Sequence, residues 1–163
     1  MAQIVTSGVF PVHNNDFEVQ LSASGRAEGE WVKVAELEEI KVTIDNNTET
    51  WSSFANEGWD SALVTGKSAK IEIKGKRCIG DAGNDLIASK LLESGQNAYI
   101  AARITSPDGK KITWEKMACG VTDAGNGGKA TDVGALEATL TGHGKPKLEN
   151  ATSTSATTAG ETE

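Results

Sequence analysis

The chain has 163 residues, a formal net charge of -7, 18 glycines and two cysteines. A single domain of this length buries about 70% of the surface of its unfolded chain, so it can fold without disulfides or metals. The net negative charge argues against general nucleic-acid binding, which needs clustered Lys and Arg. High glycine and low aromatic content favour short strands and tight turns over an all-helical bundle.

The sequence contains no run of about 18 apolar residues and no basic start that would suggest an export signal. We therefore expect a soluble protein made in a cytosol, with no membrane partner. In that compartment Cys78 and Cys119 are expected to be free thiols.

Residues 1–16 show little periodicity, and Pro11 lies near their end. They are expected to form an N-terminal arm, in which the apolar Val9 and Phe10 need something to pack against. Alternation of apolar and polar residues then predicts strands over 17–23, 31–37 and 38–46.

Residues 45–66, "DNNTETWSSFANEGWDSALVTG", form a polar segment that holds three large aromatic residues, Trp51, Phe54 and Trp59. The polarity predicts a long loop, and long loops in compact domains are usually functional. Two interpretations of the rings stay open. They pack beneath the loop into the domain's own core, or they contact another molecule, because Trp and Phe are enriched at interface anchors.

Alternation over 67–76 predicts another strand, and a helix is expected over 82–94. Asp81 is the expected N-cap, and Gly95 lies where a left-handed residue ends a helix. An apolar stripe would fasten this helix to the sheet, formed by Leu86, Ile87, Leu91 and Leu92.

The turn "SPDGK" predicts a hairpin between strands 97–105 and 110–121, and the last strand is expected over 135–142. Residues 145–149 are expected to leave the fold, which limits the β domain to 17–148. Residues 149–163 are a low-complexity polar stretch and are expected to form a disordered tail.

The stretch "GKRCIGDAGNDLIASKLLESG", residues 75–95, has the outline of a phosphate-binding loop but lacks its requirements. A Walker loop needs Lys and a hydroxyl residue after the second glycine, whereas Asn84 and Asp85 follow Gly83. The dinucleotide fingerprint spacing is also missing. Asp81 and Asp85 would repel a phosphate at this helix end.

Other chemistry is poorly supported by the sequence. His13 and His143 are isolated, and the two cysteines do not have metal-ligand spacing. Residues 123–132 lack the spacing of a calcium loop, and no serine lies in a nucleophile elbow. We therefore expect no catalytic residue, metal or cofactor, and a structural or binding role instead of an enzyme.

The order of parts resembles the major tail tube protein of long-tailed, siphovirus-type bacteriophages. The resemblance spans most of residues 17–147. Its most specific part is the strand, "GKR", "GDAG" and helix unit, followed by the hairpin and a final strand that ends in "GKPK". It implies a mainly β fold, a β-sandwich or barrel-like domain with one flanking helix.

The resemblance further implies hexameric rings that stack into a hollow tail tube, the conduit for DNA ejection. The long loop and the N-terminal arm would bridge subunits, with Trp51, Phe54, Trp59, Val9 and Phe10 as contact candidates. Implied partners are the tape measure, tail terminator and distal tail proteins. Implied locations are the virion tail and, during assembly, the cytoplasm of the bacterial host.

Strands 38–46 and 67–76 are the candidates for the lumen wall, with Glu38, Asp45 and Glu72 as acidic wall residues. DNA should pass such a wall without specific binding. The same faces carry lysines, at positions 41, 70 and 74. The wall is repulsive only if these lysines point away or are paired.

Two other classes fit the strand content. One is a binding module, an immunoglobulin-like or carbohydrate-binding β-sandwich with exposed tryptophans. The other is the tube protein of a bacterial contractile secretion system. An enzyme would rest on the glycine-rich turns alone.

Overall fold

The computed structural model describes residues 7–21 and 29–150. Eight strands form one antiparallel sheet in the order β2-β1-β5-β6-β7-β4-β3, with β8 paired to β6. The strands are β1 (Asp16–Leu21), β2 (Glu30–Lys33), β3 (Leu37–Ser52), β4 (Asp60–Lys76), β5 (Tyr99–Thr105), β6 (Lys111–Ala124), β7 (Ala135–Gly142) and β8 (Lys147–Glu149). The one α-helix of the described residues is α1 (Ala82–Ser89), and short 3-10 turns are η1 (Val12–Asn14), η2 (Phe54–Asn56) and η3 (Gly95–Ala98). The expected mainly β fold with one flanking helix is confirmed.

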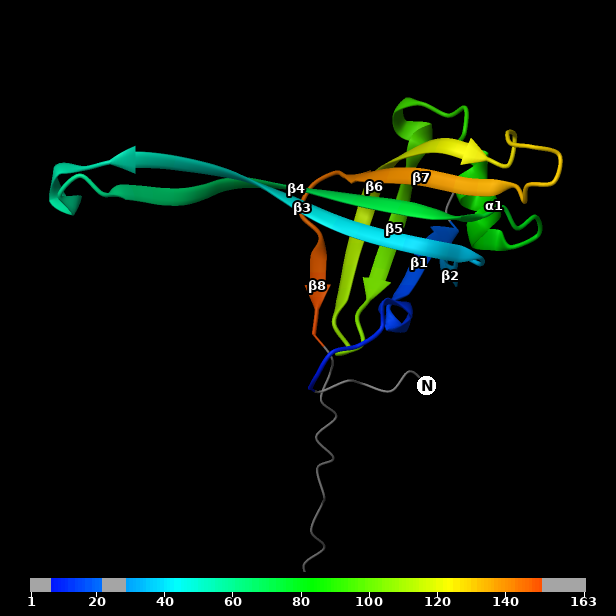
Figure 1. The fold of residues 1–163 in the computed structure, drawn as a ribbon, viewed down its shortest axis with the longest axis horizontal. Coiled ribbons are helices and arrows are strands. Elements are labelled where there is room, and N and C mark those ends of the chain that lie inside the picture. The colour runs from blue at the N-terminus through cyan, green and yellow to red at the C-terminus, as the bar shows by residue number, and fades with distance from the viewer. Residues whose placement is uncertain (1–6, 22–28, 151–163) are drawn as a thin grey trace, which may run out of the picture.

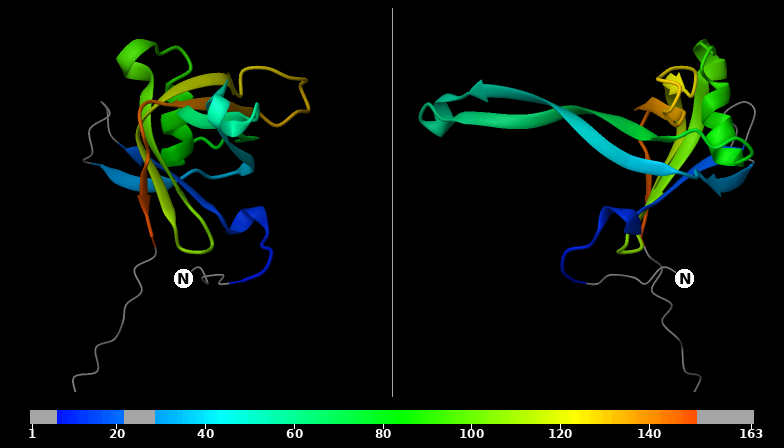
Figure 2. Two further views of the ribbon diagram at one scale, coloured as in Figure 1. Left: turned by 90° about the vertical axis from the view of Figure 1, so that its left-hand side faces the viewer. Right: turned by 45° about the vertical axis from the view of Figure 1, so that its right-hand side comes forward.

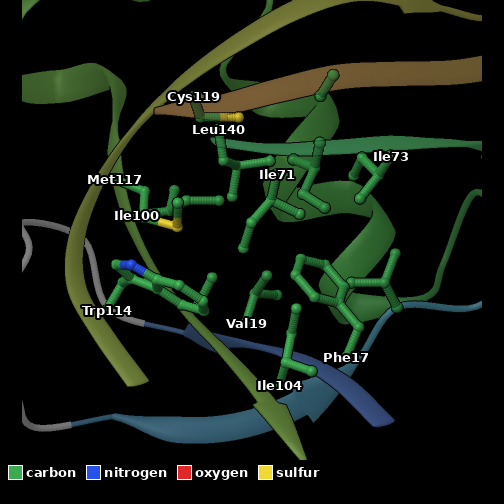
Figure 3. Packing of buried hydrophobic residues seen from close by; sticks show 14 of the residues in the cluster. Phe17, Val19, Ile71, Ile73, Ile100, Ile104, Trp114, Met117, Cys119 and Leu140 are labelled. Carbon is green, nitrogen blue, oxygen red and sulfur yellow. The ribbon is translucent and has the colours of Figure 1, made fainter. Parts of the chain in front are cut away.

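The sheet curves around a single core, and β1 and β2 run beneath β3 and β4 (Figure 1). Alternation explains which residues are inside: every second residue of a strand faces the same side, and those positions are apolar here. Ile71 on β4, Met117 on β6 and Leu140 on β7 have no exposed surface. Figure 3 shows these side chains meeting Phe17 and Val19 of β1.

Helix α1 closes one side of this core through Ile87, which is fully buried. The helix ends at Ser89, so the predicted extent to Ser94 is wrong. After Ser89 the chain continues in tight turns, with Lys90 N donating to Ile87 O at 3.1 Å and Glu93 N to Lys90 O at 3.2 Å. Leu92 is therefore 93% exposed and does not belong to the packing stripe.

The hairpin between β5 and β6 has the predicted turn. Ser106 N donates to Lys110 O at 2.8 Å, and Gly109 has a φ of 86°. Residues 145–149 do not leave the fold as predicted, because Leu148 of β8 pairs with Ile112 of β6. The tail from 151 and residues 1–6 of the N-terminal arm lie outside the described residues.

Candidate functional site

Strands β3 and β4 continue far beyond the body of the protein as a two-stranded arm (Figures 1 and 2). We call residues 45–66 the arm and residues 53–59 its tip. The ladder runs without a gap from Asp45, which faces Ser68, to Ser52, which faces Asp60, apart from a bulge at Thr65. The expected long loop over 45–66 is therefore wrong, because most of this segment is paired strand.

The tip is a defined turn with internal hydrogen bonds. Trp59 N donates to Asn56 O at 2.9 Å, and Asn56 Nδ2 donates to Ser61 Oγ at 2.6 Å. Glu57 and Gly58 have φ values of 51° and 86°, and these left-handed residues reverse the chain. The tip therefore has an ordered backbone that displays its side chains.

The three aromatic side chains of the arm are exposed: 49% for Trp51, 107% for Phe54 and 79% for Trp59. The interpretation in which they pack into the domain's own core is wrong. Single exposed apolar residues are ordinary, but three large exposed rings on one arm make the arm a candidate contact surface for another molecule.

The N-terminal segment offers a second exposed apolar group. Val9 is 103% exposed and Phe10 is 46% exposed. In Figure 1 this segment lies near the β5–β6 turn, far from the tip of the arm. The predicted contact residues thus fall into two separate places on the molecule.

The sheet ends in two edges with different lengths. Strand β2 has four residues at one edge, whereas β3 has 16 at the other. Within the described chain β3 pairs on one side only, with β4. Such an edge presents a row of unpaired N–H and C=O groups that can pair with another strand.

The face of β3, β4 and β7 that points away from the core carries alternating charges. Register places Glu39, Lys74 and Glu137 in one row and Lys41, Glu72 and Thr139 in the next. The acids and the lysines thus share one surface, which includes the proposed wall residues Asp45 and Glu72.

Two lysines of β4, Lys70 and Lys76, are paired with carboxylates, whereas Lys41 and Lys74 have no carboxylate oxygen within 4.0 Å among the described residues. Lys70 Nζ lies 2.7 Å from Glu72 Oε1, and Lys76 Nζ lies 3.6 Å from Glu38 Oε1. The hydrogen bond from Lys70 lowers the pKa of the Glu72 carboxyl group. The condition for a repulsive wall is therefore met for Lys70 but not for Lys41 and Lys74, which share the outward face with the acids.

The glycine-rich turn before α1 is filled by the protein's own groups. Asp81 occupies the N-cap position, and its Oδ2 accepts from Asn84 N at 3.0 Å. Asp85 Oδ2 accepts from Gly80 N at 3.1 Å, and its other oxygen lies 2.7 Å from Arg77 Nη1. The hydrogen bond from Arg77 lowers the pKa of the Asp85 carboxyl group.

Gly83 fits this turn because of space. A Cβ at this position would lie 2.6 Å from the Lys33 carbonyl oxygen. The glycine therefore permits close packing of α1 against the end of β2.

Among residues 7–21 and 29–150, no group of three or more His, Cys, Asp or Glu side chains could hold a metal ion. No helix within this part of the chain is long and apolar enough to span a membrane.

Sequence reasoning missed the arm because its strands lack an apolar face. The pattern had two usable signals: the β-branched Thr48 and Thr50 before the turn, and Val64 and Thr65 after it. Apolar alternation detects only strands that bury one face, and neither face of the arm is buried.

No protein-family model and no curated protein matches this chain. Solved structures do. A chain from the tail of an empty gene transfer agent particle, refined with C6 symmetry, is 16% identical, has a TM-score of 0.65, and covers 86% of this chain and 99% of its own. A chain from the native gene transfer agent virion is 16% identical with a TM-score of 0.60, covering 82% of this chain and 95% of its own. A chain from the extended sheath-tube complex of an extracellular contractile injection system is 15% identical with a TM-score of 0.54, covering 90% and 95%.

The likeness covers almost the whole of each compared chain, so the match is one of complete domains. At these identities it concerns the fold. The expected fold resemblance is confirmed: the protein has a tail tube-like β fold.

Proposed function

We propose that this chain, built on a tail tube-like β fold, is the structural subunit of a phage-type tail tube. The observation that carries the proposal is the arm, which projects from the body and exposes Trp51, Phe54 and Trp59. An arm that contributes nothing to its own core gains its burial only by contact with another molecule.

The proposed assembly is a hexameric ring, stacked into a tube. The C6 symmetry named for the similar gene transfer agent tail supports this number. The long edge of β3 supports ring closure through strand pairing, because closure removes an edge that would otherwise pair without control. Heterologous contacts that close within a plane and repeat along an axis give a filament of defined width.

The charged face of β3, β4 and β7 is the proposed lumen wall. Lys70 is paired with Glu72, and Lys41 and Lys74 alternate on this face with Glu39, Glu72 and Glu137, whose negative charges oppose the binding of phosphates. Duplex DNA could then pass without being retained during ejection. The proposed partners remain further copies of this chain and the tape measure, terminator and distal tail proteins of a siphovirus-type virion.

A second candidate is the tube of a contractile injection system. Similarity to a chain from a sheath-tube complex supports it. The two candidates share the tube and differ in whether a sheath surrounds it. The binding-module alternative has no specific support, and we propose no enzymatic activity.

Electron microscopy of the concentrated, purified protein tests the proposal. The expected result is hollow tubes of uniform width, with six-fold symmetry in end-on averages. Monomers at every concentration, with or without seeds of preformed tube, would count against a tube subunit. Binding to a glycan array by such monomers would favour the binding module.

A further inference from the structure

An apolar groove lies where the arm leaves the body. It has a volume of about 700 Å³, and its walls come from β3 and β4 on one side and from β6 and residues 144–148 on the other. The apolar lining residues are Ile44, Val64, Ala69, Ile112, Pro146 and Leu148. Pockets of roughly 300–1,000 Å³ are large enough to enclose bulky apolar groups.

The lining is exposed in the isolated chain, with Ile44 at 45%, Val64 at 49% and Leu148 at 62%. These apolar surfaces are contiguous, unlike the scattered single residues found on most surfaces. The groove is therefore a candidate for covering by another molecule.

Two lysines give the groove a positive rim, Lys67 and Lys145. Within the described residues neither has a carboxylate oxygen within 4.0 Å. Lys67 Nζ instead donates to Asn46 Oδ1 at 2.6 Å. The rim thus holds two positive charges without acidic partners in this part of the chain.

The arm has the complementary character. Beyond its aromatic rings, residues 47–66 carry Glu49, Glu57 and Asp60 and no Lys or Arg. Phe54 and Trp59 therefore lie within an acidic segment, and apolar groups with acids match an apolar groove with a lysine rim.

The tip cannot reach the groove of its own chain. Val64, the groove residue nearest the tip, pairs with Thr48, and the ladder continues from there to Ser52, so the tip lies about 13 Å or more beyond the groove at ~3.3 Å per residue. Figure 1 shows the arm pointing away from the body. An occupant with this chemistry must come from another copy.

We propose that this groove receives the tip of the arm of a second copy. Phe54 and Trp59 of the tip then contact the apolar lining residues of the groove, and Glu57 of the tip faces Lys145. The inference rests on the proposed tube function and names the two surfaces that one copy presents to the next. The contact is heterologous, because groove and tip are different surfaces, so each copy uses both and the chain of contacts can continue.

The N-terminal segment is the competing occupant, because Val9 and Phe10 are also exposed. Residues 1–12 contain no charged side chain, so they offer nothing to Lys67 and Lys145. The acidic tip fits the rim better.

Disulfide trapping between full-length chains tests the contact. Ser53→Cys places a thiol beside Phe54, and Val64→Cys places one on the groove face of β4, both in chains whose half-exposed Cys78 is replaced by Ser. Equal amounts of the two variants are mixed and mildly oxidised. We expect a mixed disulfide dimer, because docking brings the two Cα atoms within the range of a disulfide, about 4.4–6.8 Å.

Two matched serines serve as controls. Ser94→Cys is exposed and lies outside the groove, so its yield with Ser53→Cys should be several-fold lower. Ser7→Cys probes the N-terminal segment. Equal yields with Val64→Cys and Ser94→Cys, or cross-linking of Val64→Cys to Ser7→Cys in place of Ser53→Cys, would overturn the proposal.

A charge exchange gives a second measurement. Glu57→Lys and Lys145→Glu should each lower the cross-link yield about two- to fivefold, the range of exposed ion pairs, and the double variant should restore it. If the single variants do not change the cross-link yield, Glu57 and Lys145 do not take part in the contact.

Electron microscopy of the same samples separates this inference from the tube proposal. Tubes without the mixed disulfide would leave the tube function standing and overturn the tip-to-groove contact. The disulfide without tubes of any kind would support the contact and count against the tube.

Discussion

Asn84 is fully buried, and its side chain links helix α1 to residue 35 and to residues 76–78. Its Oδ1 accepts from Arg77 Nη1 at 2.8 Å and Cys78 N at 3.1 Å, and its Nδ2 donates to the carbonyls of Ala35 and Lys76. A buried amide stabilises only when all its groups are bonded, as here. The sequence predicts only a first-turn residue at this position, because the partners at 35 and 76 become neighbours through tertiary folding.

Asp81→Ala should destabilise the subunit by about 1–2 kcal/mol. The carboxylate accepts from Asn84 N and also from Ala35 N at 3.1 Å, so its loss frees two backbone donors. Urea denaturation of the unassembled subunit measures the change. Asp81→Asn keeps an acceptor and should stay within about 0.5 kcal/mol of the parent; equal losses in both variants would contradict the capping role.

Cys119 should make stability fall with alkaline pH. Burial raises the pKa of this thiol from its ordinary 9.0 to about 11. Between these values the unfolded chain loses a proton that the folded chain keeps, so rising pH favours unfolding.

Urea denaturation at several values from pH 8 to pH 11 measures this slope. Cys119→Ala should flatten it, because the variant lacks the buried thiol. The same slope in the parent chain and the Cys119→Ala chain would show that other groups cause it.

At the level of elements, the strands that bury one face could be predicted from sequence. Strand β7 begins at Ala135 and ends at Gly142, as predicted, because its alternation is strict and a core lies on one side. The arm could not be predicted in this way, since its burial depends on a second molecule. Helix α1 was overestimated because Leu91 and Leu92 fit a helical stripe. The helix instead ends at Ser89, and Lys90 Nζ donates to Asn97 O at 2.8 Å.

Trp59→Ala should leave the subunit folded and weaken assembly. The ring is 79% exposed, so the free energy of unfolding should change by less than about 0.5 kcal/mol. The critical concentration for tube growth, measured by sedimentation, should rise about tenfold or more, as for an interface anchor.

The contrasting variant is Trp114→Ala, which removes a ring that is 2% exposed. It should cost about 3–5 kcal/mol in the subunit itself. A Trp59→Ala chain that unfolds like Trp114→Ala, with no assembly defect of its own, would assign Trp59 to the fold.

At the level of the whole molecule, the exposed surfaces are distributed over the body and the arm. The charged face, the groove and the tip lie on different parts of one sheet. The sequence singled out the three aromatic residues of the arm, which are exposed, while the lumen wall stays a prediction. It could not show that Lys70 neutralises Glu72, because side chains two residues apart on one strand pair only in a particular rotamer geometry.

Glu72→Lys should convert the wall into a surface that retains DNA. The change removes the partner of Lys70 and adds a cation to every copy in the tube. Binding of duplex DNA to assembled tubes should appear at low salt and fall steeply as salt rises. Glu93→Lys makes the same charge change at an exposed site beyond α1. Equal DNA retention by this control would show that retention does not depend on a charge at the proposed wall.

A chain cut after Asn150 should still polymerise, because every described strand is kept. A chain cut after Pro146 loses β8 and Leu148 of the groove and should polymerise poorly. Electron microscopy compares the two. Failure of the longer chain would give residues 151–163 a role in assembly.

The arm's independence from the core has a consequence for how such a protein can vary. No residue from 45 to 68 belongs to the core cluster or packs against it. Two residues added to each strand would lengthen the arm by about 7 Å and keep every side chain on its original face. Matched insertions and deletions in the arm can therefore change the reach between linked subunits in fixed steps. The residues that form the core of the body stay the same.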